Sequence, residues 1–222
     1  CPLFQTSTFV FERAEDGKAF FELAYGLRKK RRAEEPGLIY SRINNPDLQI
    51  LEDRLTLWDG AEACLVFSSG MAALTTTLFA MLSKGAHVVV TDDAYRRTRQ
   101  FLNQVLRRYG VEVTTVPAGD YERMEEAIRR TTRLVFSESP TNPYNRIVDL
   151  ERLTDLGRRH RVKTVIDSTF ATPINQRPLE FGVDLVIHSA TKYLGGHNDL
   201  LAGCLLGRES LVSAIRDFQG ML

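Results

Sequence analysis

The sequence predicts an α/β fold in which helices cover both faces of a mostly parallel sheet. Three observations support this prediction. Short apolar runs alternate along the chain with segments of helical periodicity. Turns of small residues separate several of these pairs. The composition, 43% hydrophobic and 26% charged, is that of an ordinary globular domain. Strands that alternate with helices build parallel sheets with right-handed crossovers.

The charge and the cysteine content of the 222 residues limit the expected partners. The formal net charge of +1 gives no reason to expect a nucleic acid or an acidic membrane surface. The cysteines are Cys1, Cys64 and Cys204, and no Cys-x-x-Cys occurs, so neither a metal site nor a disulfide framework is predicted. We therefore expect a reducing, cytoplasmic compartment. The sequence has no apolar run of about 18 residues, and we expect no signal peptide.

The N-terminal part is predicted to lie outside the main domain. Residues 1–20 are rich in Thr and Phe and are expected to form an extended arm. The basic stretch 28–37 ends in Pro-Gly and is expected to be a solvated, mobile loop. A nucleic-acid patch is the alternative, but no aromatic residue is interleaved and acids follow at once. We predict an arm and loop over 1–45 and a large domain over 46–222.

The elements of the large domain follow in order from periodicity and turn residues. Leu48, Leu51 and Leu55 stand at helical spacing and predict a helix over 46–59 that Gly60 ends. The strands are predicted at 63–67, 87–91, 111–116, 134–137, 164–167, 185–187 and 201–207. The helices are predicted at 68–82, 121–130, 150–161 and 209–218, with another after a cap at 92–95.

The candidate site is centred on Lys192. The apolar run 185–187 predicts a buried strand, which ends in small hydroxyl residues followed by the lysine. Open α/β sheets bind ligands at the carboxyl ends of their strands. Ser189 and Thr191 can donate hydrogen bonds to an anion, and a deprotonated lysine amine is a nucleophile. An ordinary surface lysine in a turn is the alternative.

The turn Ser68-Ser69-Gly70 is a second candidate for anion binding. A small-residue turn that opens a helix presents free backbone N–H groups and the positive end of the helix dipole. No Gly-Lys-Thr follows, so this is not a Walker loop. A nucleotide-phosphate module that binds ATP or NAD is an alternative, as is a merely tight turn.

The segment Ser189–Asp199 (Ser-Ala-Thr-Lys-Tyr-Leu-Gly-Gly-His-Asn-Asp) resembles the cofactor-lysine segment of the Cys/Met-metabolism family of pyridoxal 5′-phosphate (PLP) enzymes, the trans-sulfuration enzymes. Further matches recur between Tyr40 and Gly203. A Ser-x-x-Lys alone is weak evidence, because β-lactamases also carry one. The resemblance implies the aspartate-aminotransferase-like large domain of fold-type I PLP enzymes, with PLP as cofactor. The C-terminal small domain of the family has no counterpart in this sequence.

The resemblance implies a role for each matching residue. Lys192 binds PLP covalently and moves protons, Asp167 keeps the ring nitrogen protonated, and Tyr95 stacks on the ring and assists proton transfer. The other implied contacts are Ser69, Gly70, Met71, Ser189 and Thr191 near the phosphate, Thr169 against the ring, and Asn142 at the phenolic oxygen and substrate carboxylate. Tyr40 and Arg42 are implied to bind the phosphate in a partner subunit. A helix cap at Asp167, a core tyrosine at Tyr95 and a surface Arg42 are the alternatives.

The resemblance also favours one reaction. Segments 95–99, 169–176 and 195–199 look similar to those of plant-type cystathionine γ-synthases. This favours γ-replacement on an O-activated homoserine by cysteine, which gives cystathionine in methionine biosynthesis. Arg97 stands in a neighbourhood where methionine γ-lyases have a cysteine. The alternatives are a C–S lyase (cystathionine or methionine γ-lyase), an O-acylhomoserine sulfhydrylase, and an inactive PLP-binding fragment. We expect a dimer that forms the site, assembled into a homotetramer, and no metal.

Overall fold

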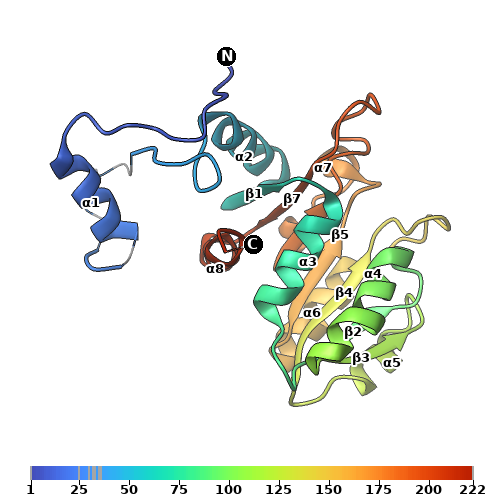
Figure 1. Ribbon diagram of the computed structural model, residues 1–222. Helices are drawn as coiled ribbons and strands as arrows, with labels where there is room; N and C mark the ends of the chain where they lie inside the picture. The colour runs from blue at the N-terminus through green and yellow to red at the C-terminus, as the bar shows by residue number, and fades with distance from the viewer. Residues whose placement is uncertain (1, 25, 30, 32–33, 35–36, 222) are drawn as a thin grey trace. The chain divides into compact units, whose positions relative to one another are not determined.

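The computed structural model describes residues 2–24, 26–29, 31, 34 and 37–221 (Figure 1). These residues form two compact units that divide between Leu51 and Glu52. None of the described helices is long and apolar enough to cross a membrane.

The N-terminal unit contains a helix that the sequence did not predict. Helix α1 covers Ala14–Ala24, so the prediction of an extended arm over 1–20 is wrong from residue 14 onward. Acids in the first turn favour the helix start, because they oppose the positive end of its dipole. Phe20 is buried, and its ring centroid lies 5.8 Å from that of Phe11. The Thr- and Phe-rich composition concealed this short amphipathic helix.

The extended part of this unit pairs through an isolated antiparallel bridge between Thr8 and Tyr40. In the basic loop, Arg28 forms ion pairs with Glu34 and with Glu22, at 2.5 and 3.3 Å. Those pairs hold the ends of the loop together. Of the loop predicted to be mobile, Lys30, Arg32, Ala33, Glu35 and Pro36 lie outside the described residues.

The large unit is built on a seven-stranded sheet with the order β1-β7-β6-β5-β4-β2-β3 in the described part of the chain. The strands are β1 Ala63–Phe67, β2 His87–Thr91, β3 Glu112–Val116, β4 Thr132–Glu138, β5 Lys163–Asp167, β6 Leu185–His188 and β7 Gly203–Gly207. Only β7 pairs antiparallel with its neighbours, β1 and β6. All other pairs are parallel, which confirms the predicted mostly parallel sheet.

Helices connect the strands and cover the sheet. The α-helices of the chain after α1 are α2 Pro46–Asp59, α3 Gly70–Met81, α4 Arg96–Gln100, α5 Tyr121–Glu126, α6 Leu150–His160, α7 Thr172–Asn175 and α8 Glu209–Gln219. A π-helical turn η1 (Phe101–Val105) and 3₁₀ turns η2 (Leu106–Tyr109) and η3 (Pro178–Phe181) complete the set. The helix predicted over 121–130 ends early, at Glu126, and the short α7 was not predicted.

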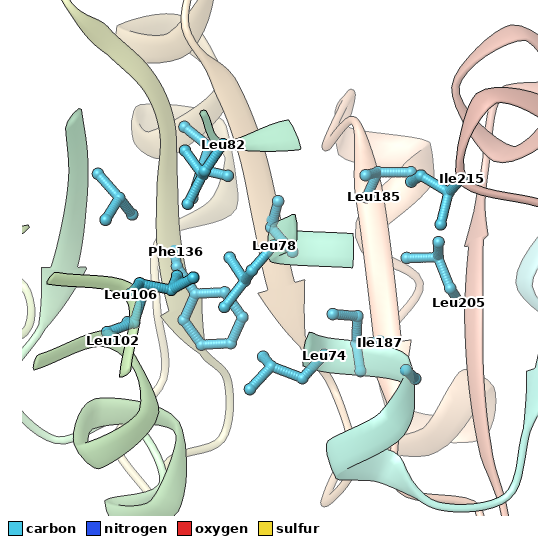
Figure 2. Close-up of a cluster of buried hydrophobic side chains, with 14 of the residues drawn as sticks. Leu74, Leu78, Leu82, Leu102, Leu106, Phe136, Leu185, Ile187, Leu205 and Ile215 are labelled. Carbon is cyan, nitrogen blue, oxygen red and sulfur yellow. The ribbon is translucent and has the colours of Figure 1, made fainter. Parts of the chain in front are cut away.

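Successive side chains of each strand point to opposite faces of the sheet, so the strands contribute to two hydrophobic layers. On one face, side chains of α3, η1, η2 and α8 pack against the sheet (Figure 2). Leu74, Leu78 and Phe136 lie in this layer and are almost fully buried. On the other face, α5 and α6 pack against Val135, Ile166 and neighbouring strand residues. Burial on both faces explains why the strands read as continuous apolar runs.

The topology brings the carboxyl ends of β1, β2, β4, β5 and β6 to one edge of the sheet. At this edge the chain turns from each strand into a loop or a helix, and ligands of open α/β sheets bind there. β7 begins at the same edge, because it runs in the opposite direction.

Candidate active site

A pocket of about 230 Å³ opens at this edge. Its lining comes from the ends of five strands and from α3 and α4. The lining residues are Ser69, Gly70, Met71, Leu74, Tyr95, Thr98, Glu138, Asn142, Asp167, Thr169, Phe170, Ser189, Thr191, Lys192 and Leu201. The predicted cofactor contacts of the large domain therefore gather in one place, although they are scattered along the sequence.

The N-terminus of α3 forms one wall of the pocket. The Ser69 side chain caps the helix by accepting a hydrogen bond from the Ala72 N–H at 3.0 Å. The first N–H groups of a helix, here those of Gly70 and Met71, have no partner inside the helix and favour an anion. A Cβ on Gly70 would lie 2.6 Å from the Ser189 Cβ, so glycine is required for this close approach.

Lys192 lies in the loop that follows β6 and lines the same pocket. Its backbone N–H donates to the Ser189 carbonyl at 3.0 Å, which fixes a tight turn. The Lys192 side chain is exposed and lines the pocket. The Thr191 hydroxyl donates to the Ala202 carbonyl at 3.1 Å, so its one proton already has an acceptor in this structure. The Ser189 hydroxyl has no hydrogen-bond partner among the described residues.

Asp167 ends β5 and lines the pocket. One carboxylate oxygen accepts hydrogen bonds from the Thr169 backbone N–H at 3.0 Å and from its hydroxyl at 2.5 Å. The same hydroxyl oxygen accepts from the Ser189 N–H at 2.8 Å, which connects the loops after β5 and β6. Burial raises the pKa of Asp167, while the hydrogen bonds from Thr169 oppose the rise. The second carboxylate oxygen has no partner within the described chain.

Glu138, at the end of β4, is a pocket residue that the sequence reasoning missed. Only 4% of its surface is exposed. Its two carboxylate oxygens accept from the Tyr95 N–H at 2.5 Å and from the Asn142 N–H at 3.1 Å. Burial, followed by the nearby charge of Asp167, raises the pKa of Glu138 to about 8. A carboxyl group at the end of a strand, before a Pro-rich loop, was the signal that could have identified it.

A basic groove adjoins the pocket and shares Tyr95 and Asn142 with it. This groove has a volume of about 540 Å³. Its other lining residues are Asp92, Asp93, Arg96, Arg99, Pro143, Tyr144 and Arg146. Asp93 is buried and lies 3.9 Å from the Arg146 guanidinium, while Arg96 is exposed. The groove therefore presents three guanidinium groups beside the pocket that contains the lysine.

Tyr40 and Arg42 belong to the N-terminal unit. The Arg42 guanidinium carbon lies 5.6 Å from the centroid of the Tyr40 ring, a cation–π contact. Their predicted contact with the phosphate in a partner subunit stays a prediction. Among the described residues, no group of three or more His, Cys, Asp and Glu side chains could hold a metal ion.

The residues of the pocket fit an anionic aromatic aldehyde such as PLP. The α3 N-terminus can accept a phosphate, and the Gly70 contact shows that the backbone there is packed for close approach. A lysine amine faces the same space, and an aspartate oxygen without a partner is available for a ring N–H. The fold and the pocket together define the large domain of a fold-type I PLP enzyme.

Comparisons with known proteins identify the family. The family model for Cys/Met metabolism PLP-dependent enzymes matches residues 1–221. The chain belongs to this family. It is 42% identical over 216 residues to the L-methionine gamma-lyase of Fusobacterium nucleatum, covering 97% of this chain. It is 41% identical over 222 residues to the chloroplastic cystathionine gamma-synthase 1 of Arabidopsis thaliana, covering all of this chain.

A solved structure agrees in fold. The crystal structure of a putative O-acetylhomoserine (thiol)-lyase from Campylobacter jejuni superposes with a TM-score of 0.87 at 30% identity, over 96% of this chain and 50% of that chain. That structure contains a pyridoxyl-lysine phosphate adduct. The chain spans 52% of the F. nucleatum lyase and 38% of the A. thaliana synthase. The predicted family, fold class and cofactor are therefore confirmed.

Proposed function

We propose that the protein catalyses PLP-dependent γ-replacement, in which cysteine displaces the activating group of an O-activated homoserine to give cystathionine. The observation that carries this choice is the basic groove beside the pocket. An activating group with a negative charge, such as a succinyl or phosphate ester, is complementary to Arg96, Arg99 and Arg146. The side chain of methionine carries no charge and gains nothing from these groups.

PLP supplies the electron sink that stabilises negative charge at the substrate carbon next to the amino group. The Lys192 amine would hold the cofactor, and as a free amine it could accept and return protons at the substrate carbons. Asp167 holds the proton of the ring nitrogen through its free carboxylate oxygen. The α3 N-terminus, with Ser189, binds the phosphate.

Two residues at the border of pocket and groove orient the substrate. Tyr95 would pack against the cofactor ring, and its phenol could assist proton transfer. The Asn142 side-chain amide would bind the cofactor oxygen and the substrate carboxylate. Glu138 holds the backbone of both residues, because each donates its N–H to one of the carboxylate oxygens. Tyr40 and Arg42 complete the phosphate site from a partner subunit, so the working form is a dimer, assembled into a cytoplasmic homotetramer.

A second candidate is a C–S lyase, which the similarity to L-methionine gamma-lyases favours. An O-acylhomoserine sulfhydrylase is a third, because the C. jejuni structure is described as such an enzyme. These reactions share the cofactor and the lysine, so the pocket alone does not separate them. An inactive PLP-binding fragment is the alternative without catalysis.

A substrate comparison tests the proposal. The protein is given O-succinyl-, O-phospho- or O-acetylhomoserine with either cysteine or sulfide, and separately methionine or cystathionine alone. Products are identified by mass spectrometry. We expect cystathionine from an anionic ester. Release of methanethiol from methionine would favour the lyase, and homocysteine from sulfide would favour the sulfhydrylase. PLP bound to Lys192 with no turnover of any substrate would favour the inactive fragment.

Variants in the groove test the observation behind the proposal. Arg96→Gln should raise KM for the anionic ester about ten-fold or more with little change for O-acetylhomoserine, because only the charged ester loses an ion pair. Arg97→Gln is the matched control: it lies on the same helix, donates to Gln100 and is not part of the groove lining. Equal effects of both variants would contradict the role of the groove.

A further inference from the structure

A second group of titratable side chains lies outside the pocket lining. Asp59, the last residue of α2, and His188, the last residue of β6, both have side chains that are 0% exposed. Asp59 Oδ2 lies 3.1 Å from His188 Nε2. His188 Nδ1 lies 3.1 Å from the Ser168 carbonyl oxygen. By strand alternation, His188 is on the sheet face of Val186, whereas Asp167 is on the pocket face.

The hydrogen bonds define the charge of His188. A carbonyl oxygen only accepts, so Nδ1 must carry a proton to bond to Ser168. The contact with Asp59 needs one further proton between Nε2 and the carboxylate. We place this proton on the imidazole: burial lowers the pKa of His188, but the hydrogen bond to Asp59 and the nearby charges leave it raised. His188 is therefore an imidazolium, and the pair is a buried ion pair.

Asp59 lies where a carboxylate needs a compensating positive charge. A carboxylate at the C-terminus of a helix is unfavourable, because that end of the helix dipole is negative. The last turn of α2 contains no basic residue. Asp59 Oδ1 is also buried, without a hydrogen-bond partner in the described chain. The charged imidazole is thus the group that compensates the buried carboxylate.

His188 also lies next to the residues of the pocket. Ser168, whose carbonyl accepts the hydrogen bond from His188, lies between Asp167 and Thr169 in the sequence. Ser189, which follows His188, donates its backbone N–H to the Thr169 hydroxyl. Burial lowers the pKa of His188. Asp59, Cys204 on β7 and Asp167 raise it, and the net effect is a raised pKa. In turn, the positive charge of His188 opposes the rise in the pKa of Asp167.

We propose that Asp59 and His188 are positioning residues, which fix the loops after β5 and β6 and bias Asp167 toward its ionised form. An ionised Asp167 is the form that can hold a ring N–H of PLP. The ion pair thus acts on the cofactor site from the opposite face of the sheet. The inference depends on PLP as the cofactor of the family and not on the particular reaction proposed above.

The first experiment measures the charge of His188 in the protein without cofactor. Long-range ¹H–¹⁵N correlation spectra of ¹⁵N-histidine-labelled protein distinguish imidazolium from neutral imidazole. We expect both nitrogens of His188 to carry protons at pH 7.5, above the ordinary pKa of about 6.5. A neutral imidazole at this pH would overturn the proposal. This measurement on the wild type does not depend on the folding of any variant.

The second experiment measures the effect on Asp167. Asp59→Asn removes the carboxylate charge, and His188→Asn keeps an N–H donor for Ser168 while removing the imidazolium. In ¹³C-aspartate spectra, each should raise the pKa of Asp167 by about half a unit or more, an approximately three-fold change in protonation. The dissociation constant of PLP at pH 7.5 should rise as well. The double variant should equal the single variants, because the two residues act as one unit.

The exposed pair Glu125–His160 supplies the matched control. His160 Nε2 lies 2.8 Å from Glu125 Oε1, the same chemistry at the surface. His160→Asn should leave the Asp167 titration and PLP binding unchanged. If folded Asp59→Asn and His188→Asn proteins also leave the Asp167 pKa unchanged, the proposed coupling is wrong. A failure of substrate turnover with the NMR results as expected would instead contradict only the proposed reaction.

Discussion

Glu138 makes the free energy of unfolding of the cofactor-free protein depend on pH. The substitution Glu138→Gln should remove this contribution. Burial, with a contribution from Asp167, raises the pKa of Glu138 from 4.5 to about 8. In this range the folded state holds a proton that the unfolded state has released. The folded state therefore binds more protons, and the free energy of unfolding falls as pH rises from 4.5 to about 8.

The size of the effect follows from the same shift. One proton changes stability by at most about 1.4 kcal/mol per pH unit. Between pH 5 and pH 8, Glu138 should thus remove about 3 to 4 kcal/mol from the wild type. Glu138→Gln eliminates this titration. It also leaves either the Tyr95 N–H or the Asn142 N–H facing an amide NH₂, which costs about 1–3 kcal/mol at every pH.

The assay is urea unfolding of the cofactor-free protein at several pH values, followed by tryptophan fluorescence and circular dichroism. We expect Glu138→Gln to be less stable than the wild type at pH 5 and equal or more stable at pH 8. Glu125→Gln is the control: Glu125 is half-buried, and Arg159 and His160 lower its pKa, so its titration has the opposite sign. Parallel stability curves for the wild type and Glu138→Gln between pH 5 and 8 would refute the reasoning.

Three further substitutions test the packing of the large unit. Gly203→Ala would place a Cβ against the Ser69 carbonyl oxygen, so we expect the free energy of unfolding to fall by about 3 kcal/mol or more and PLP binding to weaken. Urea unfolding and fluorescence titration measure the two effects. Gly220→Ala is the control and should be near neutral, because the nearest atom to its Cβ lies at 3.5 Å. Thr169→Val removes the hydroxyl that donates to Asp167 and accepts from Ser189, so the pKa of Asp167 should rise in ¹³C-aspartate spectra, and an unchanged value would contradict this. A Gly-to-Ala change inside a helix ordinarily stabilises it, but the new Cβ of Gly157→Ala would lie 2.7 Å from the Thr164 side chain and 2.9 Å from the Val162 carbonyl oxygen. We therefore expect a lower Tm in differential scanning calorimetry. A higher Tm would contradict this reasoning.

The family and the fold were accessible from the sequence because their signals are local. Strands buried on both faces read as apolar runs, and the stretch Ser189–Asp199 is specific without any tertiary information. The predicted contacts Ser69, Asp167 and Lys192 each lie at or after the carboxyl end of a strand. The rule that ligands bind at the carboxyl ends of parallel strands therefore predicted that they line one pocket.

Other features could not be read from one segment at a time. The helix α1 was missed because its stability depends on Phe20 packing against Phe11 as well as on its own pattern. The early end of α5 at Glu126 likewise has no marker in the sequence that we recognised. Helix propensity is a weak signal in short segments, where packing decides the outcome.

The sequence by itself indicated the family, the order of the strands and most of the helices, and the residue types that line the pocket. Only the tertiary structure decided that Glu138 holds Tyr95 and Asn142, and that Asp59 lies within hydrogen-bond distance of His188. The physical reason is that periodicity records which side of an element is buried. It does not record which distant residue fills the space beside it, because that depends on the order of the strands and on the insertion of the antiparallel β7 between β1 and β6.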